Sequence, residues 1–157
     1  MRNKQSGFTL IELIIVIGIS LLLFGFMTIN LVGNQKIVSV NSVRDGLVSD
    51  LTSQQTKAMG GAGGAAGTSF GIYFLSDKYI LFQGASYSPE DTSNFSVNLD
   101  SGNIFTSISF PASSIIFASG SGQIIGFQNG QNTIEIGDSQ GTRRTVTINR
   151  YGVVIGD

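Results

Sequence analysis

Few side chains in this chain could carry chemistry, because two of the commonest catalytic and metal-binding residue types are absent. The 157 residues include no histidine and no cysteine. Their absence removes histidine-based triads, thiol catalysis, disulfides and the common zinc sites. The side chains that remain as candidates are one acid in an apolar segment (Glu12), three carboxylates of a polar segment (Glu90, Asp91 and Asp100) and three arginines near the C-terminus (Arg143, Arg144 and Arg150).

The three carboxylates lie in a polar segment, residues 86–101, that we expect to be a loop. Glu90 and Asp91 are adjacent, but nothing in such a loop would force them into one pocket for acid–base catalysis. With Asp100 they could offer oxygen ligands to Ca²⁺. The dense alternating Asp/Asn spacing of a calcium loop is missing, so a solvated turn is the better interpretation. The sequence therefore predicts no enzyme, no cofactor and no metal.

Glu12 is unusual because of where it lies. From Leu13 to Gln35 there is no charged side chain, a run of 23 residues that as a helix would measure about 34 Å and could cross a bilayer. An acid within a membrane span costs on the order of 2.5 kcal/mol or more and calls for a partner or a function. Alternatively, Glu12 lies at the headgroup boundary and only favours the positive end of the helix dipole.

The apolar run could belong to a secreted protein's signal peptide or to a helix that stays with the protein. A signal peptide has a shorter apolar region, of about 7 to 15 residues, followed by a small-residue cleavage site. Here the run is longer and no such site follows it. The small residue, Gly7, instead precedes the apolar run and follows the basic residues Arg2 and Lys4. Cleavage at Gly7 would leave the hydrophobic helix in the mature protein.

The segment Lys4-Gln5-Ser6-Gly7-Phe8-Thr9-Leu10-Ile11-Glu12-Leu13 resembles the processing motif of type IV pilins and type II secretion pseudopilins. The resemblance covers about the first 30 residues. It implies that prepilin peptidase cuts after Gly7 and methylates Phe8, the new N-terminus. It also implies that Glu12 pairs with the N-terminal amine of a neighbouring subunit during filament assembly. Such pairing would relieve two charges that are each costly in lipid.

The rest of the chain divides into an amphipathic helix, a linker and a head. Apolar residues recur at steps of three, four and seven over residues 36–59, which predicts a helix with one face packed on a sheet. These apolar residues are Ile37, Val40, Val43, Leu47, Leu51 and Ala58. Residues 60–69 are a glycine-rich linker that ends the helix. A formal glycine pattern there, Gly61-x-Gly63-x-x-Ala66, lacks the preceding strand that nucleotide binding requires.

Residues 70–157 form the predicted β-rich head. Phe70–Leu75 and Lys78–Gln83 predict a hairpin around Ser76-Asp77. The later runs predict short strands separated by glycine and asparagine turns. These runs are Ile104–Ser109, Ser114–Ala118, Gln123–Gln128, Thr133–Ile136, Arg143–Asn149 and Val153–Ile155. We expect one antiparallel sheet in meander order, packed on the amphipathic helix, and hence a pilin-like α+β fold.

The C-terminal half adds a looser resemblance, to H-type minor pseudopilins and related minor pilins. It rests on the order Ile115-Ile116-Phe117, Gly120, Thr133-Ile134-Glu135-Ile136, Gly141, Thr145-Val146-Thr147-Ile148-Asn149 and Tyr151-Gly152. Together the two resemblances imply a leader at residues 1–7 and a transmembrane and filament-core helix at residues 8–35. They also imply a single-pass protein of the bacterial inner membrane, with its head outside the cytoplasm, that joins other pilin subunits in a cell-envelope filament.

Two functions follow from this sequence. The first is a structural subunit of a secretion pseudopilus or type IV pilus, assembled by helix packing. The alternative is a minor pilin that captures DNA, in which Arg143, Arg144 and Arg150 bind phosphates. Strict strand alternation would place Arg144 and Arg150 on one sheet face and Arg143 on the other.

Overall fold

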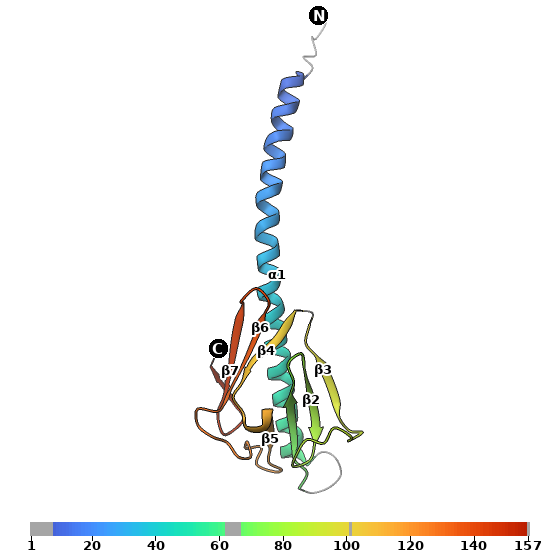
Figure 1. Ribbon diagram of the computed structural model, residues 1–157, viewed down its shortest axis with the longest axis vertical. Coiled ribbons are helices and arrows are strands. Elements are labelled where there is room, and N and C mark those ends of the chain that lie inside the picture. The colour runs from blue at the N-terminus through green and yellow to red at the C-terminus, as the bar shows by residue number, and fades with distance from the viewer. Residues whose placement is uncertain (1–7, 62–66, 101, 157) are drawn as a thin grey trace, which may run out of the picture. The chain divides into compact units, whose positions relative to one another are not determined.

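The computed structural model describes residues 8–61, 67–100 and 102–156, apart from the side chains of residues 26–38. The chain divides into two compact units, Met1–Lys36 and Ile37–Asp157. Figure 1 shows one long helix and a head made of strands. The elements are α1 (Leu10–Gly60), β1 (Phe70–Phe74), β2 (Lys78–Gln83), β3 (Phe95–Asn98), β4 (Asn103–Ile108), η1 (Pro111–Ser113), β5 (Ser114–Phe117), β6 (Thr133–Asp138), β7 (Arg143–Ile148) and β8 (Val154–Gly156).

In the second unit, α1 presents one apolar face to the sheets. Its buried positions follow the helical repeat and match the sequence prediction. They are Val40, Val43, Leu47, Leu51 and Ala58. The predicted Ile37 falls among the side chains that are not described. Gln54 lies on the same face and is only 2% exposed, with its Nε2 donating to the carbonyl oxygen of Gly71 at 3.2 Å.

The helix ends at Gly60, where the glycine-rich segment was predicted to stop it. Gly61 has a φ of +64°, the left-handed conformation that glycine adopts without steric cost. The middle of the predicted linker, residues 62–66, lies outside the described residues, as does the predicted leader, residues 1–7.

The strands form two four-stranded antiparallel sheets. One has the order β3-β2-β1-β5 and the other β4-β6-β7-β8. The α+β class is therefore confirmed, and so is the β1–β2 hairpin, whose turn is closed by a hydrogen bond from Leu75 N to Lys78 O at 2.9 Å. The expectation of a single meander sheet is wrong, because β5 leaves its sequence neighbour β4 and pairs with β1.

Two other strand predictions are also wrong. The segment 86–101, expected to be loop, contains β3, an edge strand whose partner is β2. Ser96 and Asn98 of this strand are polar, so the sequence shows no run of apolar residues there. An edge strand can be polar because little of its surface is buried. Conversely, Gln123–Gln128 forms no strand and contributes only an isolated bridge between Ile124 and Phe117.

The chain passes from the second sheet back to the first at η1, between β4 and β5. Pro111 begins this turn, and Ala112 and Ser113 adopt positive φ values of 52° and 48°. That conformation is unusual for residues with a Cβ and reverses the chain within very few residues. Phe110, immediately before the turn, is buried and fixes it to the core.

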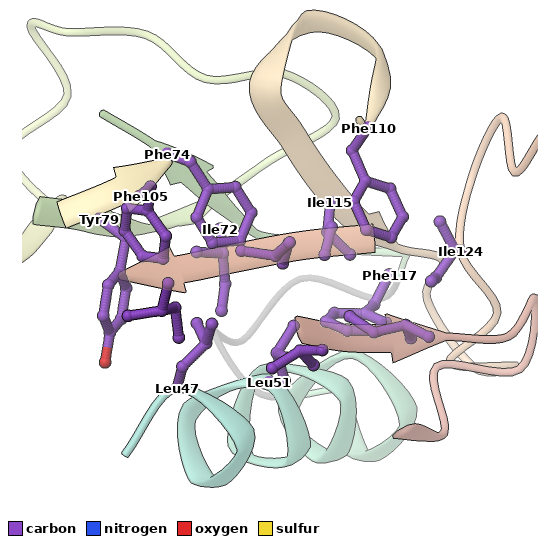
Figure 2. Packing of buried hydrophobic residues seen from close by; sticks show 14 of the residues in the cluster. Leu47, Leu51, Ile72, Phe74, Tyr79, Phe105, Phe110, Ile115, Phe117 and Ile124 are labelled. Carbon is purple, nitrogen blue, oxygen red and sulfur yellow. The ribbon is translucent and has the colours of Figure 1, made fainter. Parts of the chain in front are cut away.

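Both sheets contribute side chains to one hydrophobic core. Figure 2 shows Leu47 and Leu51 of α1 facing this cluster. Ile72, Phe74, Ile115 and Phe117 come from the first sheet, and Phe105 comes from the second. Phe74 and Phe105 meet edge to face, with ring centroids 5.3 Å apart. This contact joins the two sheets through aromatic packing.

Residues 118–132 contain no named strand, yet several hydrogen bonds, from side chain and backbone, fix parts of them to other elements. Gln55 of α1 donates from Nε2 to the carbonyl oxygens of Gly122 (2.9 Å) and Tyr151. Gly120 N donates to Ala58 O at 2.9 Å, and Ile124 N donates to Arg150 O at 3.0 Å. The last turns of α1 thus hold this segment and the turn before β8.

Candidate functional site

The first turn of α1 carries a reciprocal cap made by Thr9 and Glu12. The carbonyl of Thr9 accepts the first helical hydrogen bond, from Leu13 N at 3.2 Å. Glu12 Oε2 accepts from Thr9 N at 3.1 Å and from Thr9 Oγ1 at 3.0 Å, while Glu12 N donates back to Thr9 Oγ1 at 3.4 Å. This is a capping box, which satisfies backbone donors that a helix otherwise leaves open at its start.

The sequence prediction found Glu12 but missed Thr9. A threonine followed three residues later by glutamate, just before an apolar run, is a known helix-start signature, and it was available in the sequence. The capping box gives Glu12 an intramolecular role beside the predicted pairing with a neighbour's amine. Both roles use the same carboxylate, which is exposed at the start of the helix.

The helix that follows, together with Phe8 just before it, exposes many large apolar side chains, interrupted only by Glu12, Gly18 and Ser20 in the range 10–24. They are Phe8, Leu10, Ile11, Leu13, Ile14, Ile15, Val16, Ile17, Ile19, Leu21, Leu22, Leu23 and Phe24, and each is at least half exposed. They surround the helix on all sides instead of forming one stripe. A helix that is apolar all round needs lipid or other helices around it. Phe8, the predicted mature N-terminus, is 88% exposed.

Gly7, on the leader side of the predicted cleavage, lies outside the described residues. Within the residues that the structure describes, no helix combines the length and the hydropathy of a membrane span.

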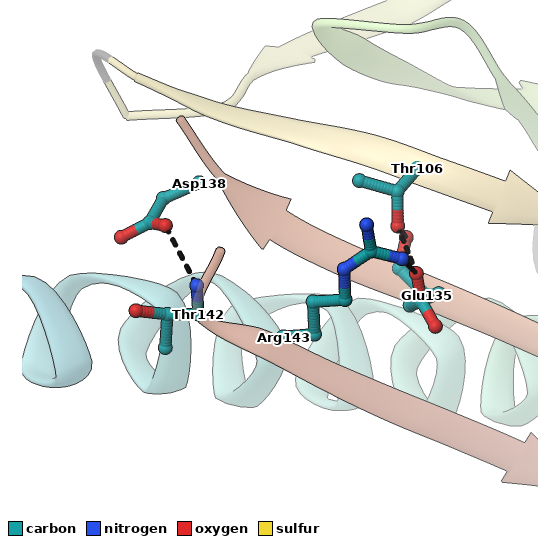
Figure 3. A network of polar contacts seen from close by, with 5 residues as sticks. All are labelled: Thr106, Glu135, Asp138, Thr142 and Arg143. Atoms are coloured by element: carbon teal, nitrogen blue, oxygen red, sulfur yellow. Dashed lines mark hydrogen bonds and ion pairs between the residues drawn. The ribbon is translucent and has the colours of Figure 1, made fainter. Parts of the chain in front are cut away.

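The three arginines proposed for DNA binding have separate surroundings. Arg143 Nη1 pairs with Glu135 Oε1 at 2.7 Å, and Thr106 donates to the same oxygen (Figure 3). These contacts, first the hydrogen bond from Thr106 and then those from Arg143, lower the pKa of Glu135 below its ordinary value. Arg143 therefore already has a carboxylate partner.

Arg144 and Arg150 differ from Arg143. Arg144 is half-buried and donates from Nε to Asn41 Oδ1, on α1, at 2.9 Å. Arg150 lies exposed in the turn beyond β7, with its guanidinium carbon 6.0 Å from the centroid of the Tyr151 ring. Since β7 rises about 3.3 Å per residue, the start of the strand and this turn are about 20 Å apart. Arg143 and Arg144 share one end of β7, and Arg150 lies at the other.

Of the predicted turn carboxylates, Asp91 folds back onto its own turn. Asp91 Oδ1 accepts from Ser93 N at 2.8 Å and from Ser93 Oγ at 2.7 Å. Both hydrogen bonds lower the pKa of Asp91, and the one from the backbone N–H of Ser93 has the larger effect. In the part of the chain that is described, Glu90, Asp91 and Asp100 belong to no group of three metal-ligating side chains.

One further polar contact was not predicted. Tyr79 is nearly buried and its hydroxyl donates to Asp50 Oδ2, on α1, at 2.6 Å. Burial, together with the adjacent carboxylate, raises the pKa of the Tyr79 phenol. The contact joins β2 to α1 and has a structural role. No local sequence signal could have found it, because the two residues are far apart in the sequence.

Comparison with known proteins finds a match to the N-terminal segment. Residues 2–28 match the family model described as the prokaryotic N-terminal methylation motif. No curated protein and no solved structure matches the chain. The match includes Gly7, Phe8, Thr9 and Glu12, so it covers both the predicted cleavage and the capping box. The motif supports a prepilin of the type IV pilin and pseudopilin kind, and it implies processing by prepilin peptidase.

Proposed function

We propose that this chain is a structural subunit, a minor pseudopilin or minor pilin, of a type II secretion pseudopilus or a type IV pilus. Prepilin peptidase would remove residues 1–7 and methylate Phe8. The apolar helix would anchor the protein in the bacterial inner membrane, with the head outside the cytoplasm. It would then enter a filament by packing against the helices of other subunits. We propose a structural role and no catalytic activity.

The observation that carries this proposal is the capped start of α1 directly before its all-round apolar surface. Glu12 is the first charged residue after the predicted cleavage, and no other follows until Lys36. The carboxylate would exchange its hydrogen bonds with Thr9 for a neighbour's N-terminal amine, and the helix would bury its apolar side chains against other helices. The looser resemblance of the C-terminal half supports an H-type minor subunit.

The test is mass spectrometry of the protein extracted from membranes of its own bacterium. We expect a mature chain that lacks residues 1–7 and carries one extra methyl group on Phe8. A strain without prepilin peptidase should yield the unprocessed, unmethylated chain. A mature protein that begins beyond residue 30 would overturn the proposal, because the apolar helix would then be discarded.

DNA capture remains the alternative prediction. It would have to use Arg150, which is exposed, together with arginines that already bind Glu135 and Asn41. A gel shift with the detergent-solubilised protein, at two salt concentrations, tests it. A structural subunit gives no shift, whereas a DNA-binding one gives a shift that weakens as salt rises.

A further inference from the structure

Met59, in the last turn of α1, is the side chain of the head that is most open to oxidation. The sequence contains neither cysteine nor tryptophan, so its thioethers are the side chains that a peroxide attacks first. Of the three methionines, Met1 lies in the predicted leader and Met27 among the side chains that are not described. Met59 remains, and it is 54% exposed. A dissolved oxidant therefore reaches this side chain while the head stays folded.

The Met59 side chain packs where Gly122 leaves room. Gly122 is buried and has a φ of +65°. A Cβ at this position would lie 2.6 Å from Cγ and 2.8 Å from Sδ of Met59, closer than real contacts allow. The thioether thus occupies space that the side chain of any other residue type at position 122 would need. This packing places an oxidisable sulfur against a buried backbone.

Gln55, one helical turn before Met59, holds the same glycine. Positions four apart lie on one face of a helix, so Gln55 and Met59 are neighbours on α1. The Nε2 of Gln55 donates to the carbonyl oxygen of Gly122 at 2.9 Å. Gly120 N donates to the carbonyl oxygen of Ala58, the residue before Met59, at 2.9 Å. Three adjacent contacts therefore fix this segment to the end of α1, and one of them is made by the thioether.

We propose that Met59 is an oxidation site and that its sulfoxide loosens residues 118–124 from α1. With hydrogen peroxide as the oxidant, a bond forms between the Met59 sulfur and one peroxide oxygen as the O–O bond breaks. The departing hydroxide takes the proton of the transferred oxygen and leaves as water, so the sulfur loses two electrons and the peroxide gains them. The sulfoxide is polar, chiral and larger than the thioether, so it fits poorly against the backbone of Gly122. The inference does not depend on the proposed function.

The oxidation is reversible by enzymes that reduce methionine sulfoxide. Two reductase types, one for each sulfoxide epimer, release the oxygen as water while two thiols are oxidised to a disulfide. The chain has no thiol of its own, so an external thiol such as dithiothreitol must supply the electrons. Reduction would restore the packing of Met59 on Gly122.

The test is hydrogen–deuterium exchange of the full-length, detergent-solubilised protein before and after treatment with dilute hydrogen peroxide. Mass spectrometry of the same digests locates the added oxygen, which we expect on Met59. The peptide that contains Gly120 and Gly122 should exchange about fourfold faster, as the loss of one methylene-sized apolar contact implies for a local opening equilibrium. Treatment with both reductases and dithiothreitol should return the exchange to its starting rate. A peptide from β6 and β7 is the reference and should not change.

Two variants separate oxidation of Met59 from oxidation elsewhere. Met59→Leu keeps an apolar side chain of similar volume and removes the sulfur. Its exchange should match that of the native chain and should not respond to peroxide, although Met27 is still present. Met59→Gln places a polar side chain at the same position and should show the faster exchange without any oxidant.

Four results would overturn the inference. The first is the absence of added oxygen on Met59 at a peroxide concentration that oxidises free methionine. The second is an oxidised Met59 with unchanged exchange at Gly120 and Gly122. The third is an equal response to peroxide in Met59→Leu, and the fourth is equally faster exchange in the reference peptide, which would indicate general unfolding instead of a local loosening.

Discussion

The two roles of Glu12 can be separated by three substitutions at the start of α1. Glu12→Gln keeps a side chain that can close the capping box with Thr9 but removes the charge. Glu12→Ala removes both. Thr9→Ala breaks the capping box and keeps the charge. Since the contacts are all within one helical turn, none of the three substitutions touches the head.

The expected losses differ enough to be measured. A helix cap contributes about 1 kcal/mol, which corresponds to about a fivefold change in an equilibrium constant. Leaving a charge unpaired among apolar helices costs about 2.5 to 3.5 kcal/mol, or roughly 60-fold and more. If Glu12 pairs with a neighbour's amine, Glu12→Gln should therefore reduce assembly by about 60-fold, because the amine is left without its partner. Glu12→Ala should lose up to about fivefold more, because the cap is lost as well, and Thr9→Ala should lose about fivefold at most.

The assay is the amount of assembled protein, sheared from cells or crosslinked in the membrane, measured by immunoblot against equal amounts of total subunit. Processing at Phe8 is checked in each variant by mass spectrometry, so that a failure of cleavage is not counted as a failure of assembly. If Glu12→Gln assembles like the native chain while Glu12→Ala does not, the carboxylate serves only as a cap, and the pairing argument is wrong.

Three further predictions concern the head, each measured by thermal unfolding of the detergent-solubilised protein. Leu51→Ala should destabilise the head by about 2 to 5 kcal/mol, because Leu51 is buried in the core; Leu51→Met, which conserves volume, should cost less than about 1.5 kcal/mol. Gly71→Ala should destabilise the head by about 1 to 3 kcal/mol, because the new Cβ would lie 2.6 Å from a backbone carbonyl oxygen of β5 that cannot move away. An unchanged unfolding temperature in this variant would contradict the packing. The hydrogen bond from Thr106, and then the contacts from Arg143, lower the pKa of Glu135. The ionised Glu135 therefore stabilises the head above pH 4.5, and this contribution is lost as the pH falls through the lowered pKa. In Glu135→Gln this part of the pH dependence of stability should be absent.

The sequence allowed the helical part to be predicted well, because its signals are local. The repeat of Val40, Val43, Leu47 and Leu51 identifies the buried face, and the glycines after Met59 identify its end. The β1–β2 hairpin was predictable for the same reason, since two apolar runs flank a two-residue turn. Each of these features depends on residues within a few positions of one another.

The arrangement of the sheets could not be predicted, because it depends on contacts between distant residues. Nothing local in Ser114–Phe117 indicates that it pairs with β1 and not with β4. The positive φ angles of Ala112 and Ser113 occur at residues that rarely adopt them, so no glycine marked the passage from β4 to β5 in the sequence. The partner of Arg144 is likewise on α1, more than one hundred positions earlier in the chain.

The bonds from Gln55 to Gly122 and Tyr151 have a consequence for protease sensitivity. A segment such as 118–132, without regular secondary structure, is ordinarily where an enzyme first cuts. Here the part around Gly120 and Gly122 is fixed by the final turns of α1, so cleavage at these positions is expected to require those turns to unwind first. The rate of nicking between positions 118 and 123 thus becomes a gauge of fraying at the C-terminal end of the helix, in the free subunit and in any larger complex alike.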